Sequence, residues 1–355
     1  MMYDIAIVGA GPAGSTLARL IGRQYKVLLI DKRDLGNEKP LRSQSKCCGG
    51  LLAPDAQKMI AKLGLAIPKD ILVNPQIFAV RTLDLTNHLE RLYQRHYLNM
   101  DRERFDRWLI SMLPMEVDQR FDALFKNFIE IPEGYELQYM YKGQEVKART
   151  KILVGADGAF SRLRKLVCGE DDSPEKYVSI QEWYECSDPM PYFTSVFDEE
   201  ISDFYSWVIP KEGYLLLGAA LKPQEDTWER YLRLKTKLTK LGFRFDHKIK
   251  TEGAYIYRTK KGSQLWAGKD RIAFIGEAAG AISPSSAEGI SYALKSALYL
   301  SQSLEEGIDG FMERYHQQMK GIRRNILIKN LKSPAMYNPF LRKLAMKSGL
   351  QSMDK

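Results

Sequence analysis

The sequence has no long apolar run, few cysteines and few histidines. Its longest uninterrupted apolar stretch, Tyr214–Leu221 (YLLLGAAL), is far shorter than the roughly 20 residues that a bilayer-spanning helix needs. The four cysteines form no CxxC pair, which excludes a zinc ribbon and a disulfide scaffold. The four histidines are scattered, and no metal site is predicted.

The composition is that of a soluble globular protein, with 355 residues, 45% hydrophobic and 27% charged. This length suits two domains, or one large α/β domain with an inserted subdomain. The first apolar run begins at Tyr3 and leads directly into a glycine turn, so we expect no signal peptide and a cytoplasmic location. The net charge of +9 does not by itself indicate nucleic acid, and no nucleic-acid partner is predicted.

The excess positive charge is concentrated at the C-terminal end. From His316 onward, nine Lys or Arg residues accompany a single acid, Asp354. Apolar residues alternate with these cations, which predicts two basic amphipathic helices broken near Pro334 and Pro339. We expect a peripheral contact with an anionic membrane, at the inner face of the cell membrane. The alternative is a solvated helix pair packed on the main domain.

The first 31 residues carry the strongest motif. Tyr3–Val8 predicts a strand, Gly9–Gly14 (GAGPAG) a turn that opens a helix, and Lys26–Ile30 a second strand that ends in Asp31. This order and spacing are the dinucleotide fingerprint. The glycines permit a tight turn, close approach of a pyrophosphate and close packing of helix on strand, while helix-start N–H groups face the phosphates. Asp31 is placed to accept hydrogen bonds from ribose hydroxyls.

Three later segments favour FAD over NAD. Arg102 stands at the start of an amphipathic helix, where its guanidinium can reach phosphate or ribose oxygens. Asp157 lies in Gly155–Arg164 (GADGAFSRLR), after a predicted buried strand, with Ser161 as a helix N-cap. Gly276–Gly280 (GEAAG) also follows a buried strand, and its small residues would let a flat ring approach the backbone.

Together these motifs resemble the FAD-dependent oxidoreductases of the aromatic hydroxylase fold. That resemblance implies an α/β protein: a Rossmann-like three-layer FAD-binding domain with an inserted β-sheet substrate domain. Glu277 stands where the family pattern has Asp. The cofactor-binding residues that we predict are Gly9, Gly11, Pro12, Ala13, Gly14, Asp31, Lys32, Cys48, Gly49, Arg102, Asp157, Gly276, Glu277, Ala281, Gly289 and Ile290.

Two further segments resemble the geranylgeranyl reductases. Ser45–Pro54 (SKCCGGLLAP) is similar to their PCGGxL loop, with Cys47 in place of the proline, and Tyr205–Gly213 (YSWVIPKEG) is similar to their YxWxFPxxG signature, with Ile209 in place of Phe. The combined pattern is closer still to a bacterial branch associated with colicin M resistance, in which the Glu277 variant is expected. In the family this signature lines the prenyl cavity and faces the flavin.

Alternation along the predicted strand places Tyr205 and Trp207 on the same side, where aromatic rings suit an isoprenoid. The alternative is that this strand only packs the core of the inserted sheet. Cys48 is expected near the flavin ring, as a weak hydrogen-bond donor, a packing residue, a proton relay or an inert thiol. We therefore predict Cys48, Tyr205 and Trp207 as catalytic residues.

The predicted FAD-binding domain is discontinuous, over residues 1–75, 98–168 and 262–305. The β-rich substrate domain takes residues 76–97 and 169–261, and residues 306–355 form the basic helical segment. The local sequence pattern of residues 40–110, taken by itself, indicates loop and helix, although residues 76–97 are assigned to the β-rich domain.

The predicted activity is FAD-dependent reduction of carbon–carbon double bonds in a hydrophobic prenyl or lipid-like substrate. The external electron donor is open, either NAD(P)H or a ferredoxin-like carrier, because no second dinucleotide fingerprint is present. One alternative is a flavin monooxygenase or halogenase, since the Tyr205 segment also resembles the WxWxIP motif of flavin halogenases. Another is a membrane-associated flavoprotein that acts as a resistance factor.

Overall fold

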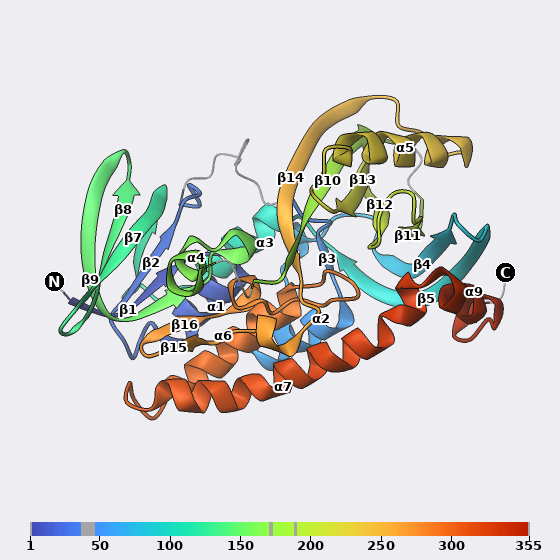
Figure 1. Ribbon diagram of the computed structural model, residues 1–355. Helices are drawn as coiled ribbons and strands as arrows, with labels where there is room; N and C mark the ends of the chain where they lie inside the picture. Colours follow the sequence, from blue (N-terminus) through green and yellow to red (C-terminus); the bar gives the residue numbers. More distant parts are fainter. Residues whose placement is uncertain (1, 37–46, 170–172, 188–189, 354–355) are drawn as a thin grey trace.

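The structure is a computed structural model that describes residues 2–36, 47–169, 173–187 and 190–353. Two β-sheets lie side by side along the long axis of the molecule, with helices beneath the first and above the second (Figure 1). Among the described residues, no helix is both long enough and apolar enough to cross a membrane.

The first sheet has the strand order β15-β16-β9-β1-β2-β6, and the β7–β8 hairpin extends it from β9. The neighbours β16, β9, β1, β2 and β6 are all parallel. Its central strands read as continuous apolar runs because both faces of the sheet are covered. The strands are β1 (Met2–Val8), β2 (Val27–Asp31), β6 (Asp118–Phe121), β7 (Ala123–Ile131), β8 (Gly134–Tyr141), β9 (Gln144–Gly155), β15 (Gly268–Lys269) and β16 (Ile272–Phe274).

Helices cover the lower side of this sheet, and the β7–β8 hairpin rises on the other side (Figure 1). Helix α1 packs on α6, and α6 packs on both α2 and α7. The helices of this half are α1 (Pro12–Ile21), α2 (Pro54–Lys62), α3 (Arg102–Ser111), α4 (Arg162–Cys168), α6 (Ile290–Leu304) and α7 (Phe311–Lys332), with 3-10 turns η1 (Lys69–Ile71), η2 (Gly158–Phe160), η3 (Gly262–Gln264) and η4 (Gly276–Ala279).

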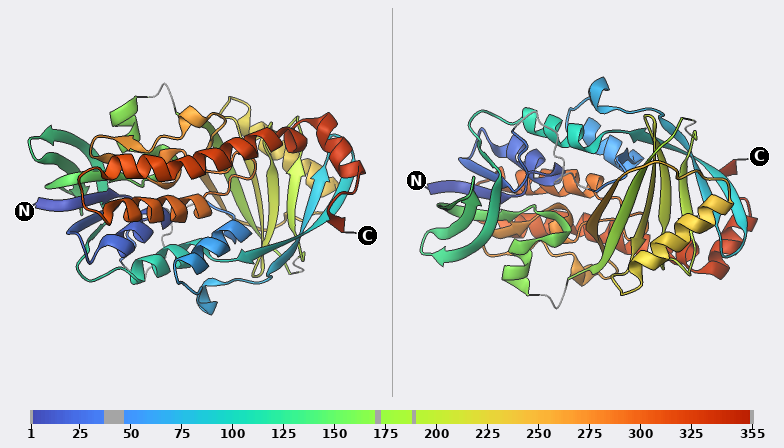
Figure 2. Two further views of the ribbon diagram at one scale, coloured as in Figure 1. Left: turned by 90° about the horizontal axis from the view of Figure 1, so that it is seen from below. Right: turned by 90° about the horizontal axis from the view of Figure 1, so that it is seen from above.

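The second sheet has the order β14-β10-β13-β12-β11-β4-β5-β17, with β3 paired to β5. Helix α5 (Thr227–Lys240) covers one face, as the right-hand view of Figure 2 shows. On the opposite face of this sheet, side chains form an aromatic cluster. This cluster also includes residues from the half of the molecule that contains the first sheet, which we call the nucleotide half. The strands are β3 (Leu51–Leu52), β4 (Ile77–Asp84), β5 (Leu89–Asn99), β10 (Glu175–Glu185), β11 (Phe193–Phe197), β12 (Ser206–Lys211), β13 (Tyr214–Leu221), β14 (Lys248–Arg258) and β17 (Ser352–Met353).

Two expectations about local structure need correction. Loop and helix were expected throughout residues 40–110, but β4 and β5 form a long hairpin there, stabilised by pairing with distant β11. At the C-terminal end, the predicted breaks at Pro334 and Pro339 are confirmed. They separate α7, α8 (Pro334–Tyr337) and α9 (Pro339–Lys347), so the segment has a third, short helix that was not expected.

Candidate functional site

Four parallel strands end side by side and bring the predicted motifs together. The sheet register aligns Ile30 of β2 with Val8 of β1, Val8 with Gly155 of β9, and Gly155 with Phe274 of β16. Each strand is followed at once by a predicted motif: Asp31, the glycine turn, the Asp157 segment and the Glu277 segment. Ligands of open α/β sheets bind at this carboxyl edge.

The glycine turn is crowded on one side and open on the other. A Cβ on Gly14 would lie 1.8 Å from the carbonyl oxygen of Gly9, so α1 packs directly on the turn. Gly9 has φ 107°, and a Cβ there would lie 2.5 Å from the oxygen of Ala156. Around Gly11, by contrast, no described atom beyond Gly11 and its chain neighbours lies within 4 Å of an added Cβ. This open cradle at a helix N-terminus fits a pyrophosphate.

The two residues after Gly11 start the helix itself. Pro12 occupies its first position, where its missing N–H costs no intrahelical bond. Ala13 is buried, and its Cβ would contact a Cβ added to Gly276, at 3.0 Å. The glycine turn and the Glu277 segment are thus packed against one another.

Asp31 organises the turn through hydrogen bonds within the protein. One of its oxygens, Oδ2, accepts from the backbone N–H of Ala10 at 2.7 Å. Arg33 donates to both of its oxygens, at 3.1 Å each. These contacts fix the carboxylate beside the turn, and its predicted hydrogen bonds to ribose stay a prediction. Lys32, between them, is exposed.

A chain of alternating charges connects Asp31 to helix α3. Arg33 pairs with Asp106 at 2.7 Å, and Asp106 pairs with Arg102 at 2.8 Å. Asp106 is 1% exposed. Burial opposes its ionisation, but Arg102 and Arg33 outweigh that effect and hold the pKa of Asp106 below its ordinary value. Arg102 also hydrogen-bonds the Cys48 thiol. This contact connects the row of buried charges to residues 47–50, the Cys48 loop.

Arg33 and Asp106 were not predicted as site residues. Asp106 stands one helical turn after Arg102, and this i, i+4 spacing of opposite charges was a usable signal. No comparable signal marked Arg33, because its partner Asp106 is distant in the sequence. Arg102 was expected to reach phosphate or ribose oxygens; its guanidinium has two protein partners here, and that role stays a prediction.

Lys211 holds the Cys48 loop in place and was also missed. Its ammonium donates to the carbonyls of Gly50 and Met100 and to the side-chain oxygen of Asn99, at 3.2, 2.7 and 2.7 Å. Only 4% of the residue is exposed, and burial lowers its pKa to about 8. A Cβ on Gly49 would lie 2.7 Å from Ile209, so the loop lies directly against β12.

The acids of the other two motifs are engaged within the protein. Asp157 accepts from the Ser161 hydroxyl at 2.5 Å and from the backbone N–H of Arg162 at 2.9 Å. Burial raises its pKa. Ser161 caps α4 as predicted. Glu277 accepts from the backbone N–H of Tyr257 on β14, at 3.0 Å, and so connects its turn to the second sheet.

The remaining predicted cofactor residues flank the start of α6. Gly276 has φ 60°, and its N–H donates to Ser296 at 2.8 Å. Ala281 is fully buried in the hydrophobic core formed by the first sheet and its helices, which we call the first core. Its side chain therefore contributes packing beneath the turn. Gly289 is the N-cap residue of α6, and Ile290 is its first helical residue and 9% exposed. The backbone N–H of Ser291 at this helix start donates to the Glu288 side chain at 2.9 Å, and cofactor binding by Gly289 and Ile290 stays a prediction.

The predicted catalytic residues lie in one region, between the two sheets. The rings of Tyr205 and Trp207 are 5.6 Å apart, on one side of β12. The Trp207 indole covers Gly218 and donates to Gln181 at 3.3 Å, while Gln181 also contacts the Cys48 carbonyl at 3.5 Å. Trp207 is 6% exposed, so it also packs the core of this sheet, as the alternative reading required.

Tyr205 connects the second sheet to the nucleotide half. Its hydroxyl donates to the carbonyl of Ser286, in the loop before α6, at 2.8 Å. Burial raises the pKa of Tyr205, so the phenol keeps its proton near neutral pH.

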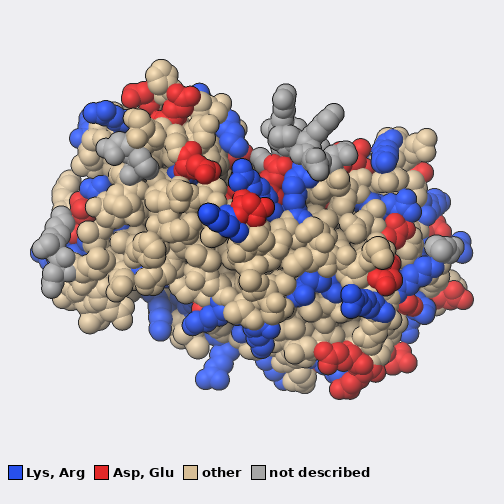
Figure 3. All heavy atoms as spheres, turned by 180° about the vertical axis from the view of Figure 1, so that it is seen from behind, with Lys and Arg blue, Asp and Glu red and all other residues tan. Residues whose placement is uncertain are grey.

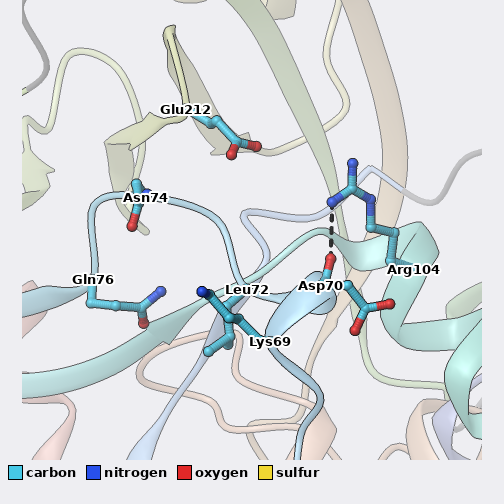
Figure 4. A pocket seen from close by; sticks show the side chains of 7 residues that line it. All are labelled: Lys69, Asp70, Leu72, Asn74, Gln76, Arg104 and Glu212. Carbon is cyan, nitrogen blue, oxygen red and sulfur yellow. Dashed lines mark hydrogen bonds between the residues drawn. The ribbon is translucent and has the colours of Figure 1, made fainter.

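A hollow of about 670 Å³ is lined by residues that precede β4, by Arg104 of α3 and by Glu212, and Figure 4 shows these lining side chains. Apart from Leu72, its lining side chains are polar and carry both signs of charge, and Arg104 donates to the Asp70 carbonyl at 2.9 Å. The described lining includes none of the predicted site residues. In the described part of the chain, no group of three or more His, Cys, Asp or Glu residues could hold a metal.

Comparison with known proteins places the chain. The model of a family described as FAD binding domain matches residues 2–325. The chain belongs to this family. Among curated relatives, Protein CbrA of Escherichia coli O157:H7 is 38% identical over 348 residues, which cover 98% of this chain and 97% of that protein. The predicted family and FAD as cofactor are thereby confirmed.

Solved structures confirm the predicted fold of this flavoprotein. A geranylgeranyl bacteriochlorophyll reductase-like protein from Thermoplasma acidophilum superposes with a TM-score of 0.80, at 19% identity, over 97% of this chain and 90% of its own. PqsL of Pseudomonas aeruginosa, a probable FAD-dependent monooxygenase, gives 0.72 at 15% identity, over 98% and 99%. At these identities the two structures show the fold alone.

The open cradle at Gly11 fits the family's cofactor. Bound FAD supplies hydride or electron transfer. The glycine turn and helix start would hold its pyrophosphate, and the buried charge chain keeps that turn and α3 in fixed positions. The Cys48 loop and the aromatic side of β12 are predicted to form the wall of the site on the second sheet.

Proposed function

We propose that this FAD-dependent oxidoreductase reduces carbon–carbon double bonds of a prenyl or other lipid-like substrate. The observation that carries the proposal is the aromatic cluster on the second sheet, which meets the Cys48 loop and the nucleotide half. Its buried members come from five strands and from the bend before β12, and include Tyr177, Phe193, Phe204 and Trp207. Aromatic walls bury apolar chains without leaving a polar group unpaired.

The reduction adds a hydride to one carbon and a proton to the other, and the reduced flavin is the source of the hydride. Cys48 and Tyr205 are the chain's own candidate proton donors. The Tyr205 phenol is protonated near neutral pH and is held by its hydrogen bond to Ser286. Arg102 holds the Cys48 thiol. NAD(P)H or a ferredoxin-like carrier would return electrons to the flavin.

Anaerobic reoxidation tests the proposal. Enzyme reduced with dithionite is mixed, without O₂, with a polyunsaturated prenyl lipid in detergent, and the flavin spectrum and product mass are followed. The proposal expects flavin reoxidation and a product that has gained two hydrogen atoms for each double bond reduced. Reoxidation that needs O₂ and yields an oxygenated or halogenated product would replace it with the monooxygenase or halogenase reading.

A pair of tyrosine variants locates the reaction. Tyr205→Phe should retain FAD, because Tyr205 lies on the second sheet, but should slow reoxidation by the lipid. Tyr214→Phe is the matched control, since Tyr214 is 39% exposed on β13. Loss of flavin in Tyr205→Phe, with normal rates per bound flavin, would show that the strand has only a structural role.

A further inference from the structure

The outward side of α7 combines exposed apolar residues with cations. Its inward side is buried in the first core and includes Met319, Ile322 and Ile326. On the opposite side, Leu327, Ile328 and Leu331 are 43%, 42% and 82% exposed. Helical spacing places the exposed Lys320 and Arg324 among them. A helix already packed on one side therefore presents a second apolar stripe to solvent.

Helix α9 has the same two-sided character. Arg342 points inward and forms a buried bidentate ion pair with Asp84, at 2.8 and 3.0 Å. Strand β17 pairs with β5 just beyond, so the segment is fixed to the second sheet. On the outward side, Phe340 and Leu344 are 67% and 52% exposed. Lys343 and Lys347 lie at helical spacing beside them and are also exposed.

The charge on these helices is of one sign. No Asp or Glu occurs between residues 314 and 353. The acids of this region, Glu305, Glu306, Asp309 and Glu313, precede or begin α7. Figure 3 shows the separation along the lower edge of the molecule, with basic side chains over one part and acidic ones at the other end. Both α7 and α9 lie on the underside in the left view of Figure 2.

The segment from α7 to α9 adjoins the region that holds Tyr205 and Trp207. Tyr337 of α8 packs against Phe204 of the aromatic cluster, with ring centroids 5.3 Å apart. Its hydroxyl donates to the carbonyl of Ser285 at 2.6 Å, next to the Ser286 carbonyl that Tyr205 holds. The short helix between α7 and α9 is therefore in direct contact with the region that holds the predicted catalytic residues.

We propose that the α7–α9 surface, defined by Lys320, Arg324, Leu327, Ile328, Leu331, Phe340, Lys343, Leu344 and Lys347, binds an anionic lipid bilayer peripherally. The apolar side chains enter the headgroup region, and the cations contact lipid phosphates. Charge complementarity selects an anionic membrane, and the exposed Leu331 and Phe340 distinguish this surface from a purely solvated basic face. The proposal does not depend on the reaction that the flavin catalyses.

Vesicle sedimentation with the full-length, FAD-loaded protein tests this. Vesicles of phosphatidylcholine alone are compared with vesicles that contain phosphatidylglycerol, at low and high salt. We expect binding only to the anionic vesicles, reversed by salt because the attraction fades beyond a Debye length. Phe340→Glu combined with Leu344→Glu should weaken binding by about tenfold or more, because it removes apolar contacts and adds negative charge.

Leu232→Glu combined with Leu241→Glu is the matched control. These leucines are 43% and 52% exposed, at and just beyond α5 on the second sheet, and the charge change is the same. Thermal melting checks that both double variants fold. Wild-type failure to bind anionic vesicles, or equal weakening by the control pair, would overturn the proposal. Deleting the helices is no test, because Met319, Ile322 and Ile326 belong to the first core.

Discussion

Substitution of Gly11 by Val should separate FAD binding from folding. The backbone of Gly11 is extended, at φ −74° and ψ −175°, a conformation open to any residue. Among the described residues other than its chain neighbours, no atom lies within 4 Å of an added Cβ. The folded protein therefore accommodates the side chain, and losing a glycine reduces the entropy of the unfolded chain. We expect the FAD-free variant to be as stable as wild type, or more stable by about 0.4–1 kcal/mol.

FAD affinity should fall, because the isopropyl group occupies the space by which a pyrophosphate approaches the turn. Overpacking of a fitted site costs about 1–3 kcal/mol, which corresponds to roughly a 5- to 150-fold weaker Kd. FAD at 100 times the wild-type Kd stabilises wild type by about 2.7 kcal/mol. A variant whose Kd is 100-fold weaker would gain only about 0.4 kcal/mol under the same conditions.

The assay is a titration of flavin-free protein with FAD, together with thermal melting with and without FAD. Gly14→Ala is the contrasting control. Its Cβ would lie 1.8 Å from the Gly9 oxygen, so this variant should lose stability even without FAD. Wild-type affinity in Gly11→Val would refute the placement of the pyrophosphate, and normal stability in Gly14→Ala would refute the packing argument.

Three other substitutions test the buried charges. Asp106→Asn should destabilise by about 3–5 kcal/mol. Wild type should have an extra contribution to the free energy of unfolding above about pH 4, which it loses as pH falls through the lowered pKa of Asp106. Asp106→Asn should lack this contribution, as measured by urea unfolding. In wild type, the free energy of unfolding should rise by about 3 kcal/mol from about pH 8 to 10.5, because the unfolded chain keeps the Lys211 proton to higher pH than the folded protein does. Lys211→Met should abolish this rise, and identical pH profiles for the variant and wild type would contradict the argument. Arg342→Ala leaves Asp84 buried without its partner and should cost about 3–5 kcal/mol in thermal or urea unfolding, whereas the exposed Lys343→Ala should change stability by less than about 0.5 kcal/mol.

The sequence by itself determined the cofactor class and the local structure of its motifs. The glycine turn, Asp31 and the later motifs could be identified because each depends on residues a few positions apart. The same holds for the Ser161 cap and for the helix breaks at Pro334 and Pro339, since caps and prolines act on their immediate neighbours.

Only the tertiary structure decided which groups share a site. Parallel pairing aligns strands that are more than 100 residues apart. Packing of helices and loops against the sheets gives Arg33 its partner Asp106 and Lys211 its contact with Gly50. It also anchors the basic C-terminal helices through Arg342 and Asp84, which the sequence separates by 258 positions. Charge and apolar content along the chain cannot show such pairings, because they depend on strand order and register, which are set by packing across the whole molecule.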